Sequence, residues 1–148
     1  MKVSFTIMGE PCGKGRPRFS NKGSHTYTPA KTSRYENLVK LEYERQCVHR
    51  FADDEQLDMR IYAYYGVPKS DSKKKADQKL SGIIRPAKKP DMDNVMKIVA
   101  DSLNGIAYRD DTQIVDSMVR KFYSDRPRVQ IIIQTVRRAS DDAESVEK

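Results

Sequence analysis

The most informative part of this sequence is residues 89–116, which read KPDMDNVMKIVADSLNGIAYRDDTQIVD. Mostly apolar residues recur there at i, i+3, i+4, i+7 and i+8, namely Val95, Ile98, Val99, Ser102 and Leu103. This spacing predicts an amphipathic helix with these residues as its buried stripe. At about 100° per residue, Asp93, Lys97 and Asp101 fall together on the opposite face of that helix.

Further carboxylates flank the predicted helix on both sides. Asp91 precedes it directly, and the pair Asp110 and Asp111 follows it after a short connection. Carboxylates that converge with a lysine among them are what a Mg²⁺-dependent phosphodiesterase needs, because Mg²⁺ prefers oxygen ligands and lowers the pKa of a bound water. Only one of the adjacent aspartates is expected to point into such a site.

Each of these residues also has a purely structural interpretation. Asp93 suits the N-cap of the helix, whereas Asp91 follows Pro90 in an extended stretch and has no such role. Lys97 is one turn after Asp93 and suits an i,i+4 ion pair. Asp101 suits an ordinary solvated charge. The spacing alone leaves both interpretations open.

The rest of the chain predicts an α/β (α+β) fold, with a mixed, mostly antiparallel sheet of about four strands packed with helices. Alternation of apolar and polar residues predicts strands at 3–7, 59–65, 114–123 and 129–136. Residues 124–127 are expected to join the last two strands as a hairpin turn. The run 131–133 is apolar on both faces, which is typical of a central strand.

Two further helices are expected. Ser33 and Glu36 form a capping-box pattern that predicts a helix running to about residue 50, and its inward residues are expected to be Leu38, Leu41 and Val48, joined by Tyr35. A short helix is expected from a cap at Ser70 or Asp71 through Lys79, with Gly82 as its stop. Gly105 is expected at C′ of the central helix, and residues 110–112 in a turn or tiny helix.

The size and composition indicate one domain over residues 1–137, followed by a disordered acidic tail at 138–148. Cys12 and Cys47 stand far apart without a CxxC pattern, which favours free thiols over a zinc site. No run approaches the ~18 apolar residues of a membrane span, and residues 1–8 are too polar for a signal peptide. A cytoplasmic protein without membrane association is therefore expected.

The net charge of +7 is concentrated in two stretches, residues 10–22 and 68–90. The second carries eight Lys and Arg against two Asp. Such stretches indicate a polyanion as partner, with a solvated basic face as the alternative. The residues expected to contact phosphates are Lys14, Arg16, Arg18, Lys73, Lys74, Lys75, Lys88 and Lys89. The loop at 9–19 is not a P-loop, because three residues rather than four separate Gly9 from Gly13.

Residues 90–97, 101–105 and 108–115 resemble the RusA family of Holliday junction resolvases. These are crossover junction endodeoxyribonucleases, often encoded by phages or prophages. The family pattern D-x-D-N-x-x-K followed by D-D-x-Q-[IV] is matched by residues 91–97 and 110–114. The resemblance also takes in residues 14–19 and the lysine run after Pro68, and it ends near Gln134, so that the tail lies outside it.

The resemblance implies that Asp91, Asp93 and Asp111 hold Mg²⁺, for which Mn²⁺ can substitute, and that these residues and Lys97 are catalytic. Asp110 and Asp116 are further candidates. It also implies a homodimer that resolves four-way DNA junctions by nicking two opposed strands, in DNA recombination and repair. Two alternatives remain: a nuclease acting mainly on flaps or other branched DNA, and a non-catalytic DNA-binding module.

Overall fold

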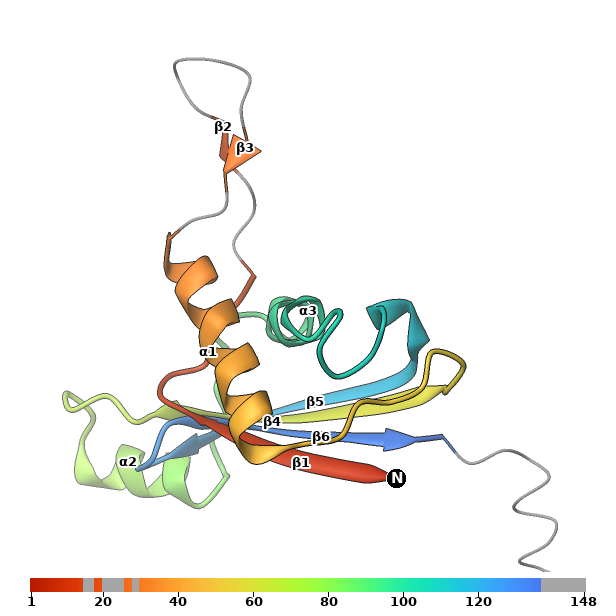
Figure 1. The fold of residues 1–148 in the computed structure, drawn as a ribbon. Coiled ribbons are helices and arrows are strands. Elements are labelled where there is room, and N and C mark those ends of the chain that lie inside the picture. The colour runs from red at the N-terminus through yellow and green to blue at the C-terminus, as the bar shows by residue number, and fades with distance from the viewer. Residues whose placement is uncertain (15–17, 20–25, 28–29, 137–148) are drawn as a thin grey trace, which may run out of the picture.

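The computed structural model describes residues 1–14, 18–19, 26–27 and 30–136, so the expected acidic tail lies outside the described residues. The strands are β1 (Lys2–Met8), β2 (Arg18–Phe19), β3 (Thr26–Tyr27), β4 (Leu57–Gly66), β5 (Ile114–Ser124) and β6 (Arg128–Thr135). The helices are α1 (Ala30–Gln46), α2 (Lys73–Leu80), α3 (Met92–Ser102) and a short 3-10 helix, η1 (Asp111–Gln113). Figure 1 shows α1 and α3 on one face of the main sheet.

The main sheet has the strand order β1-β6-β4-β5, and β2 and β3 form a separate small ribbon. β6 pairs antiparallel with both β1 and β4, whereas β4 and β5 are parallel. The predicted fold class, a mixed and mostly antiparallel four-stranded sheet with helices, is therefore confirmed. The central place predicted for β6 is also confirmed, with Ile131 and Ile133 fully buried.

The predicted hairpin between β5 and β6 is wrong. Residues 124–127 do reverse the chain, but in the described sheet β4 lies between the two strands. The physical reason lies in burial. β6 is apolar enough to be paired on both sides, whereas β5 carries exposed polar residues such as Ser117 and Arg120 and takes the edge.

The core lies between the sheet and the pair α1 and α3. The alternation predicted for β4 is confirmed, because Met59, Ile61, Ala63 and Tyr65 are all buried. The predicted stripe of α3 is confirmed at every position, Val95, Ile98, Val99, Ser102 and Leu103. A fully buried Ile or Leu side chain contributes roughly 1.5–3 kcal/mol, so this stripe is what fixes α3 on the sheet.

Helix α1 differs from the prediction at both ends. It begins at Ala30, which places Ser33 and Glu36 inside the helix rather than in a capping box, and it ends at Gln46. Its buried residues are Thr32, Val39 and Tyr43, while Tyr35 and Leu38 are partly buried against the core.

Two residues expected on the inner side of α1 are instead exposed. Leu41 is 59% exposed, because it lies two residues from the buried Val39 and therefore about 200° around the helix. Val48 is fully exposed, at 102%, because the helix has already ended before it. The buried face of α1 is therefore narrower and rotated relative to the prediction.

The cap of α2 is Ser72, whose side chain accepts a hydrogen bond from the backbone of Lys75, and not Ser70 or Asp71. Asp71 is unavailable as a cap because its carboxylate pairs with the buried Lys79 at 2.5 Å. Gly82 follows the helix at a φ of +85°, as expected for its stop.

Gly105 lies one position away from its predicted place, and the two cysteines are as predicted. Gly105, also at positive φ, lies two residues after the C-cap Leu103 of α3, one position later than predicted. Both cysteines, Cys12 and Cys47, are free and buried, which confirms the free thiols. In the part of the chain that the structure describes, no helix has the length and apolar character needed to cross a membrane.

Candidate active site

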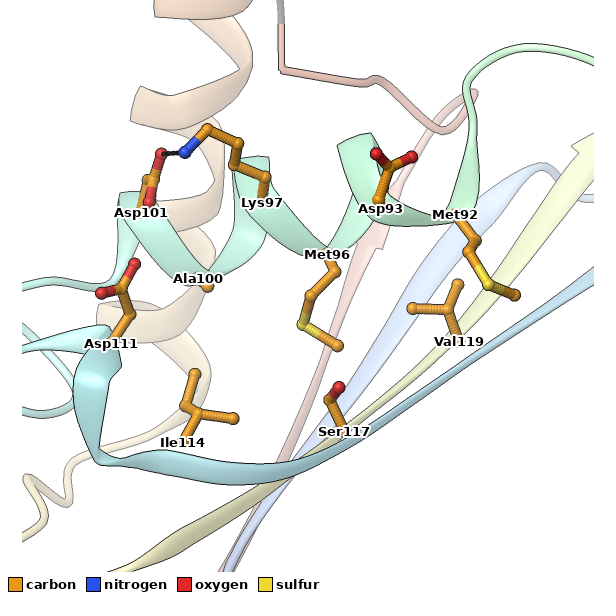
Figure 2. Close-up of a pocket in the computed structure, with 10 residues that line it drawn as sticks. All are labelled: Met92, Asp93, Met96, Lys97, Ala100, Asp101, Asp111, Ile114, Ser117 and Val119. Atoms are coloured by element: carbon orange, nitrogen blue, oxygen red, sulfur yellow. Dashed lines mark ion pairs between the residues drawn. The ribbon is translucent and has the colours of Figure 1, made fainter.

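A cavity of about 500 Å³ lies between α3 and the start of β5. Figure 2 shows Met92 and Met96 pointing down from α3 toward Val119 and Ser117 of β5. The charged residues that line the same cavity are Asp93, Lys97, Asp101 and Asp111. The cavity therefore has an apolar floor and a charged rim, and the rim gathers three aspartates and one lysine.

The register of α3 determines how the first two aspartates lie. The helix begins at Met92, so Asp91 occupies the N-cap position and Asp93 lies in the first turn, and the alternative of Asp93 as the N-cap is wrong. Among the described residues, the Asp91 side chain makes no capping hydrogen bond. The turn before it is held by the Tyr65 hydroxyl, which donates to the Pro90 carbonyl at 2.7 Å.

Asp91 is exposed and is not among the described residues that line the cavity. It lies near Lys121 of β5. The pKa of Lys121 is lowered overall. Burial and the charge of Lys88 lower it, and together they outweigh the charge of Asp91, which raises it. The structure thus brings Asp93 and Asp111 to one cavity and leaves Asp91 at the amino end of α3.

The adjacent pair Asp110 and Asp111 divides into one structural and one cavity residue. The Asp110 carboxylate accepts hydrogen bonds from the Asp111 amide at 3.0 Å and the Thr112 hydroxyl at 2.9 Å. The Gln113 side chain accepts in turn from the Asp110 amide at 3.3 Å, which completes a capping box for η1. The Asp110 carboxylate is thereby engaged in capping η1, whereas Asp111 lines the cavity.

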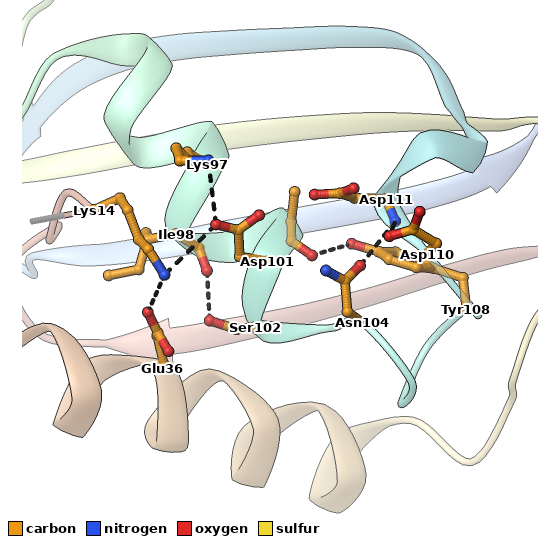
Figure 3. Close-up of polar contacts among 11 residues, drawn as sticks. Lys14, Glu36, Lys97, Ile98, Asp101, Ser102, Asn104, Tyr108, Asp110 and Asp111 are labelled. Atoms are coloured by element: carbon orange, nitrogen blue, oxygen red, sulfur yellow. Dashed lines mark hydrogen bonds and ion pairs between the residues drawn. The ribbon is translucent and has the colours of Figure 1, made fainter. Parts of the chain in front are cut away.

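Two residues that sequence reasoning missed hold Asp111 in place. The Asn104 side chain accepts a hydrogen bond from the Asp111 amide at 2.8 Å, and the buried Tyr108 hydroxyl donates to the Ala100 carbonyl at 2.7 Å (Figure 3). The second bond ties the connection before η1 to α3. The predicted pattern already contained both residues, but their roles depend on a turn geometry that residue types alone do not give.

The carboxylates at the rim are crowded. In Figure 2, Asp111 points from η1 toward Asp101 on α3. Burial, the side-chain contact with Asp101 and the negative charges of Asp101 and Asp110 all raise the pKa of Asp111. Mutual repulsion of this kind favours the approach of a cation.

Asp101 is not the solvated charge that its position suggested. One of its oxygens, Oδ2, lies 3.5 Å from the ammonium of Lys97 and 3.5 Å from that of Lys14 (Figure 3). Its side chain is 24% exposed, whereas that of Lys97 is 60% exposed. Lys97 therefore does form an i,i+4 ion pair, but with Asp101 one turn later and not with Asp93.

The oxygen donors at the cavity agree with the ion that the family resemblance implied. In the described ranges, no three His, Cys, Asp or Glu side chains come together as a group that could hold a metal ion. Mg²⁺ binds through one or two carboxylates and keeps several waters, so Asp93 and Asp111 at one open cavity fit its chemistry. Asp116 is exposed on β5 and on the opposite face from Ser117, because side chains alternate along a strand.

The basic residues predicted to contact phosphates lie in different settings. Lys73, Lys74 and Lys75 are exposed on α2, and Lys88 and Lys89 are exposed just before Asp91. Lys14 is instead paired with acidic side chains. Arg16 lies outside the described residues, and only the backbone of Arg18, in β2, is described.

A basic chain that gathers aspartates and a lysine at one cavity has the character of a DNA-cleaving enzyme. The sequence matches the family model described as Endodeoxyribonuclease RusA over residues 8–134, so the chain belongs to this family and is a nuclease by class. It is also 39% identical over 140 residues to "Uncharacterized protein YqaN" of Bacillus subtilis (strain 168), an alignment that covers 90% of this chain and 96% of that protein.

The exposed lysines of α2 give a testable prediction about affinity. Replacing Lys73, Lys74 and Lys75 together by alanine is expected to weaken DNA binding, most strongly at low salt. For each phosphate that the variant no longer binds, the magnitude of the slope of log K against log salt should fall by roughly 0.9. Fluorescence anisotropy over a salt series measures this slope, with Lys2→Ala on β1 as the control. A slope that stays at the wild-type value would remove these lysines from the interface.

Proposed function

We propose that this protein is a Mg²⁺-dependent endonuclease that resolves Holliday junctions by paired nicks. The observation that carries the proposal is the cavity that Asp93, Lys97 and Asp111 line in a chain of the RusA endodeoxyribonuclease family. These residues come from the two halves of the motif, 91–97 and 110–114, and α3 and η1 bring the halves together.

The proposed metal ligands are Asp91, Asp93 and Asp111. Asp93 and Asp111 already line the cavity. Among the described residues, the Asp91 carboxylate makes no capping hydrogen bond to α3, which leaves it available as a ligand. A bound Mg²⁺, or Mn²⁺ in its place, would neutralise the phosphate oxygens and lower the pKa of a bound water. The three aspartates would hold that ion, and its charge would orient the phosphodiester for attack.

Lys97 is the proposed electrostatic stabiliser. Its side chain is 60% exposed at the rim and its ammonium lies 3.5 Å from Asp101 Oδ2, so its ion pair is loose enough to leave donors for a phosphate. A fixed positive charge at the scissile group stabilises the transition state more than the ground state, because negative charge develops on the oxygens during attack. The exposed lysines of α2 and of residues 88–89 are the proposed contacts to the arms of the DNA.

Cleavage of labelled four-way, flap and linear duplex DNA, with and without Mg²⁺, tests this function. The expected result is Mg²⁺-dependent nicking of opposed strands in the four-way junction and little cutting of the linear duplex. Preferential cutting of flaps would make the protein a nuclease for other branched structures. Binding without cutting under every condition would make it a DNA-binding module.

We also propose that the protein acts as a homodimer through the sheet face turned away from α1 and α3. Facing residues on β4 and β5 stack there, with the rings of Tyr64 and Phe122 5.8 Å apart. The guanidinium of Arg128 lies 3.9 Å from the centre of the Tyr64 ring, and that of Arg120 lies 5.1 Å from that of Phe122. Tyrosine and arginine are enriched in protein interfaces.

Sedimentation velocity is expected to give twice the chain mass of 17.0 kDa. Tyr64→Glu should shift the protein to monomer, because it buries a charge in the proposed interface. Val48→Glu, at an exposed position away from this face, should have no such effect. A wild-type monomer at micromolar concentration would contradict the dimer.

A further inference from the structure

We propose that Lys14 is a positioning residue of the cleavage site and not a DNA contact. Lys14 holds the Asp101 carboxylate, and through Asp101 it sets the place and the availability of the Lys97 ammonium. This inference rests on the proposed nuclease function. It assigns to the cleavage site a residue that lies far before both motif segments, 91–97 and 110–114, in the chain.

The surroundings of the Lys14 side chain are those of a structural cation. Its ammonium lies 2.5 Å from Glu36 Oε1 on α1 and 3.5 Å from Asp101 Oδ2 on α3, and its side chain is only 20% exposed. Burial lowers the pKa of Lys14, but the contacts with Glu36 and Asp101 outweigh it, so that the pKa is raised and the amine stays charged. An ammonium group that is already paired with two carboxylates has few N–H donors free to bind a phosphate.

The backbone before Lys14 is fitted closely to the start of α3. The Lys14 amide donates a hydrogen bond to the Asn94 carbonyl at 3.1 Å. A Cβ atom on Gly13 would lie 2.8 Å from Cβ of Pro90 and 3.1 Å from Cβ of Asn94, which is too close for an ordinary side chain. Only glycine lets the chain approach this segment, so the Lys14 side chain starts from a fixed point between α1 and α3.

Asp101 connects Lys14 to the cavity. The same oxygen that contacts Lys14 also contacts Lys97, and Figure 3 shows Asp101 between the two lysines. One carboxylate shared by two ammonium groups binds each of them less tightly than it would bind one alone. Lys14 thus neutralises Asp101 and leaves Lys97 available at the rim, where its side chain is 60% exposed.

Removing the Lys14 charge should therefore change the cavity and not the DNA interface. Without it, Asp101 draws Lys97 into a closer ion pair, and its unbalanced charge adds to the repulsion that Asp111 already experiences. Glu36 and Asp101 also lose the cation that joins α1 to α3. The expected result is slower cleavage at unchanged affinity.

Lys14→Met, which keeps the length of the side chain and removes its charge, tests the inference. Single-turnover cleavage with saturating protein is expected to slow by about 10-fold or more, as for the loss of other groups that orient an active-site residue. The salt slope of junction binding, measured without Mg²⁺, should stay at the wild-type value. Lys14→Arg should restore part of the rate, and Lys2→Met, at an exposed lysine on β1, should change neither quantity.

A double-variant cycle separates this role from a general loss of structure. If Lys14 acts through Lys97, Lys14→Met combined with Lys97→Ala should cut no more slowly than Lys97→Ala alone. Asp101→Asn removes the carboxylate through which Lys14 acts on Lys97, so adding Lys14→Met to Asp101→Asn should slow cleavage no further. Lys14→Gln keeps the inference testable if Lys14→Met fails to fold.

The inference is overturned if Lys14→Met lowers the magnitude of the salt slope by roughly 0.9 and leaves the saturated rate unchanged, since Lys14 would then be a phosphate contact. It is also overturned if the rate reductions from Lys14→Met and Lys97→Ala multiply. A wild-type protein that does not cut any of the DNA substrates would instead refute the proposed function, which is a separate outcome.

Discussion

Asp91→Asn, Asp93→Asn and Asp111→Asn are each expected to abolish DNA cleavage and to leave junction binding intact. Asparagine keeps the size of the side chain but removes the negative charge that holds a divalent cation. Binding should persist because less negative charge near DNA does not weaken its attraction to a chain of net charge +7.

Cleavage and gel-shift assays on the same four-way junction measure the two effects separately. Mg²⁺ titration by calorimetry should show weakened metal binding in the same variants. Asp54→Asn, at an exposed loop aspartate, is the matched control and should cut like the wild type. The ligand assignment fails if two of the three variants retain near-normal rates with Mg²⁺.

Lys97→Ala is expected to bind Mg²⁺ and junction DNA and to cut about 10²–10³-fold more slowly, the reduction typical of removing one electrostatic stabiliser. An exposed i,i+4 ion pair alone is worth only about 0.3–0.5 kcal/mol, so the pair with Asp101 does not explain such a reduction. A catalytic Lys97 and a merely ion-paired Lys97 therefore differ by orders of magnitude in the cleavage rate expected for Lys97→Ala.

Single-turnover cleavage with saturating protein isolates the chemical step from affinity. Arginine at position 97 should restore only part of the rate, because its planar fork does not place a compact charge at the same point. A Lys97→Ala rate within a few-fold of wild type would reduce Lys97 to the ion-pair partner of Asp101.

The elements that the sequence predicted well are those with strong local periodicity. The stripe of α3 and the alternation of β4 follow from which residues are apolar, and both are buried as expected. The order of the strands does not follow from any local pattern, since the short connection at 124–127 suits a hairpin and also suits a step across β4. The start of α1 was misplaced because Ser33 and Glu36 have cap-like spacing by coincidence.

The candidate site shows the same division. The motif placed Asp93, Lys97 and Asp111 in one cavity, because helix periodicity and a short connection constrain them. Asp110 and Gln113 have the spacing of an N-cap and N3 residue, so a capping box could have been predicted from the sequence. The ion pairs of Lys14 had none, since they join residues from three distant parts of the chain that meet only when α1 and α3 pack together.

The route of the chain between β4 and β5 has a consequence for biosynthesis. These strands are parallel, and the connection between them carries α2, α3 and η1, so Asp91, Asp93, Lys97 and Asp111 all lie on this one crossover. Closing such a long loop costs entropy that only the strand pairing repays. A chain still emerging from the ribosome, with α3 made but β5 not yet paired, has neither the floor of the cavity nor Asp111 in place. The cavity is therefore complete only after β5 has joined the sheet, because Ile114, Ser117 and Val119 of β5 line it.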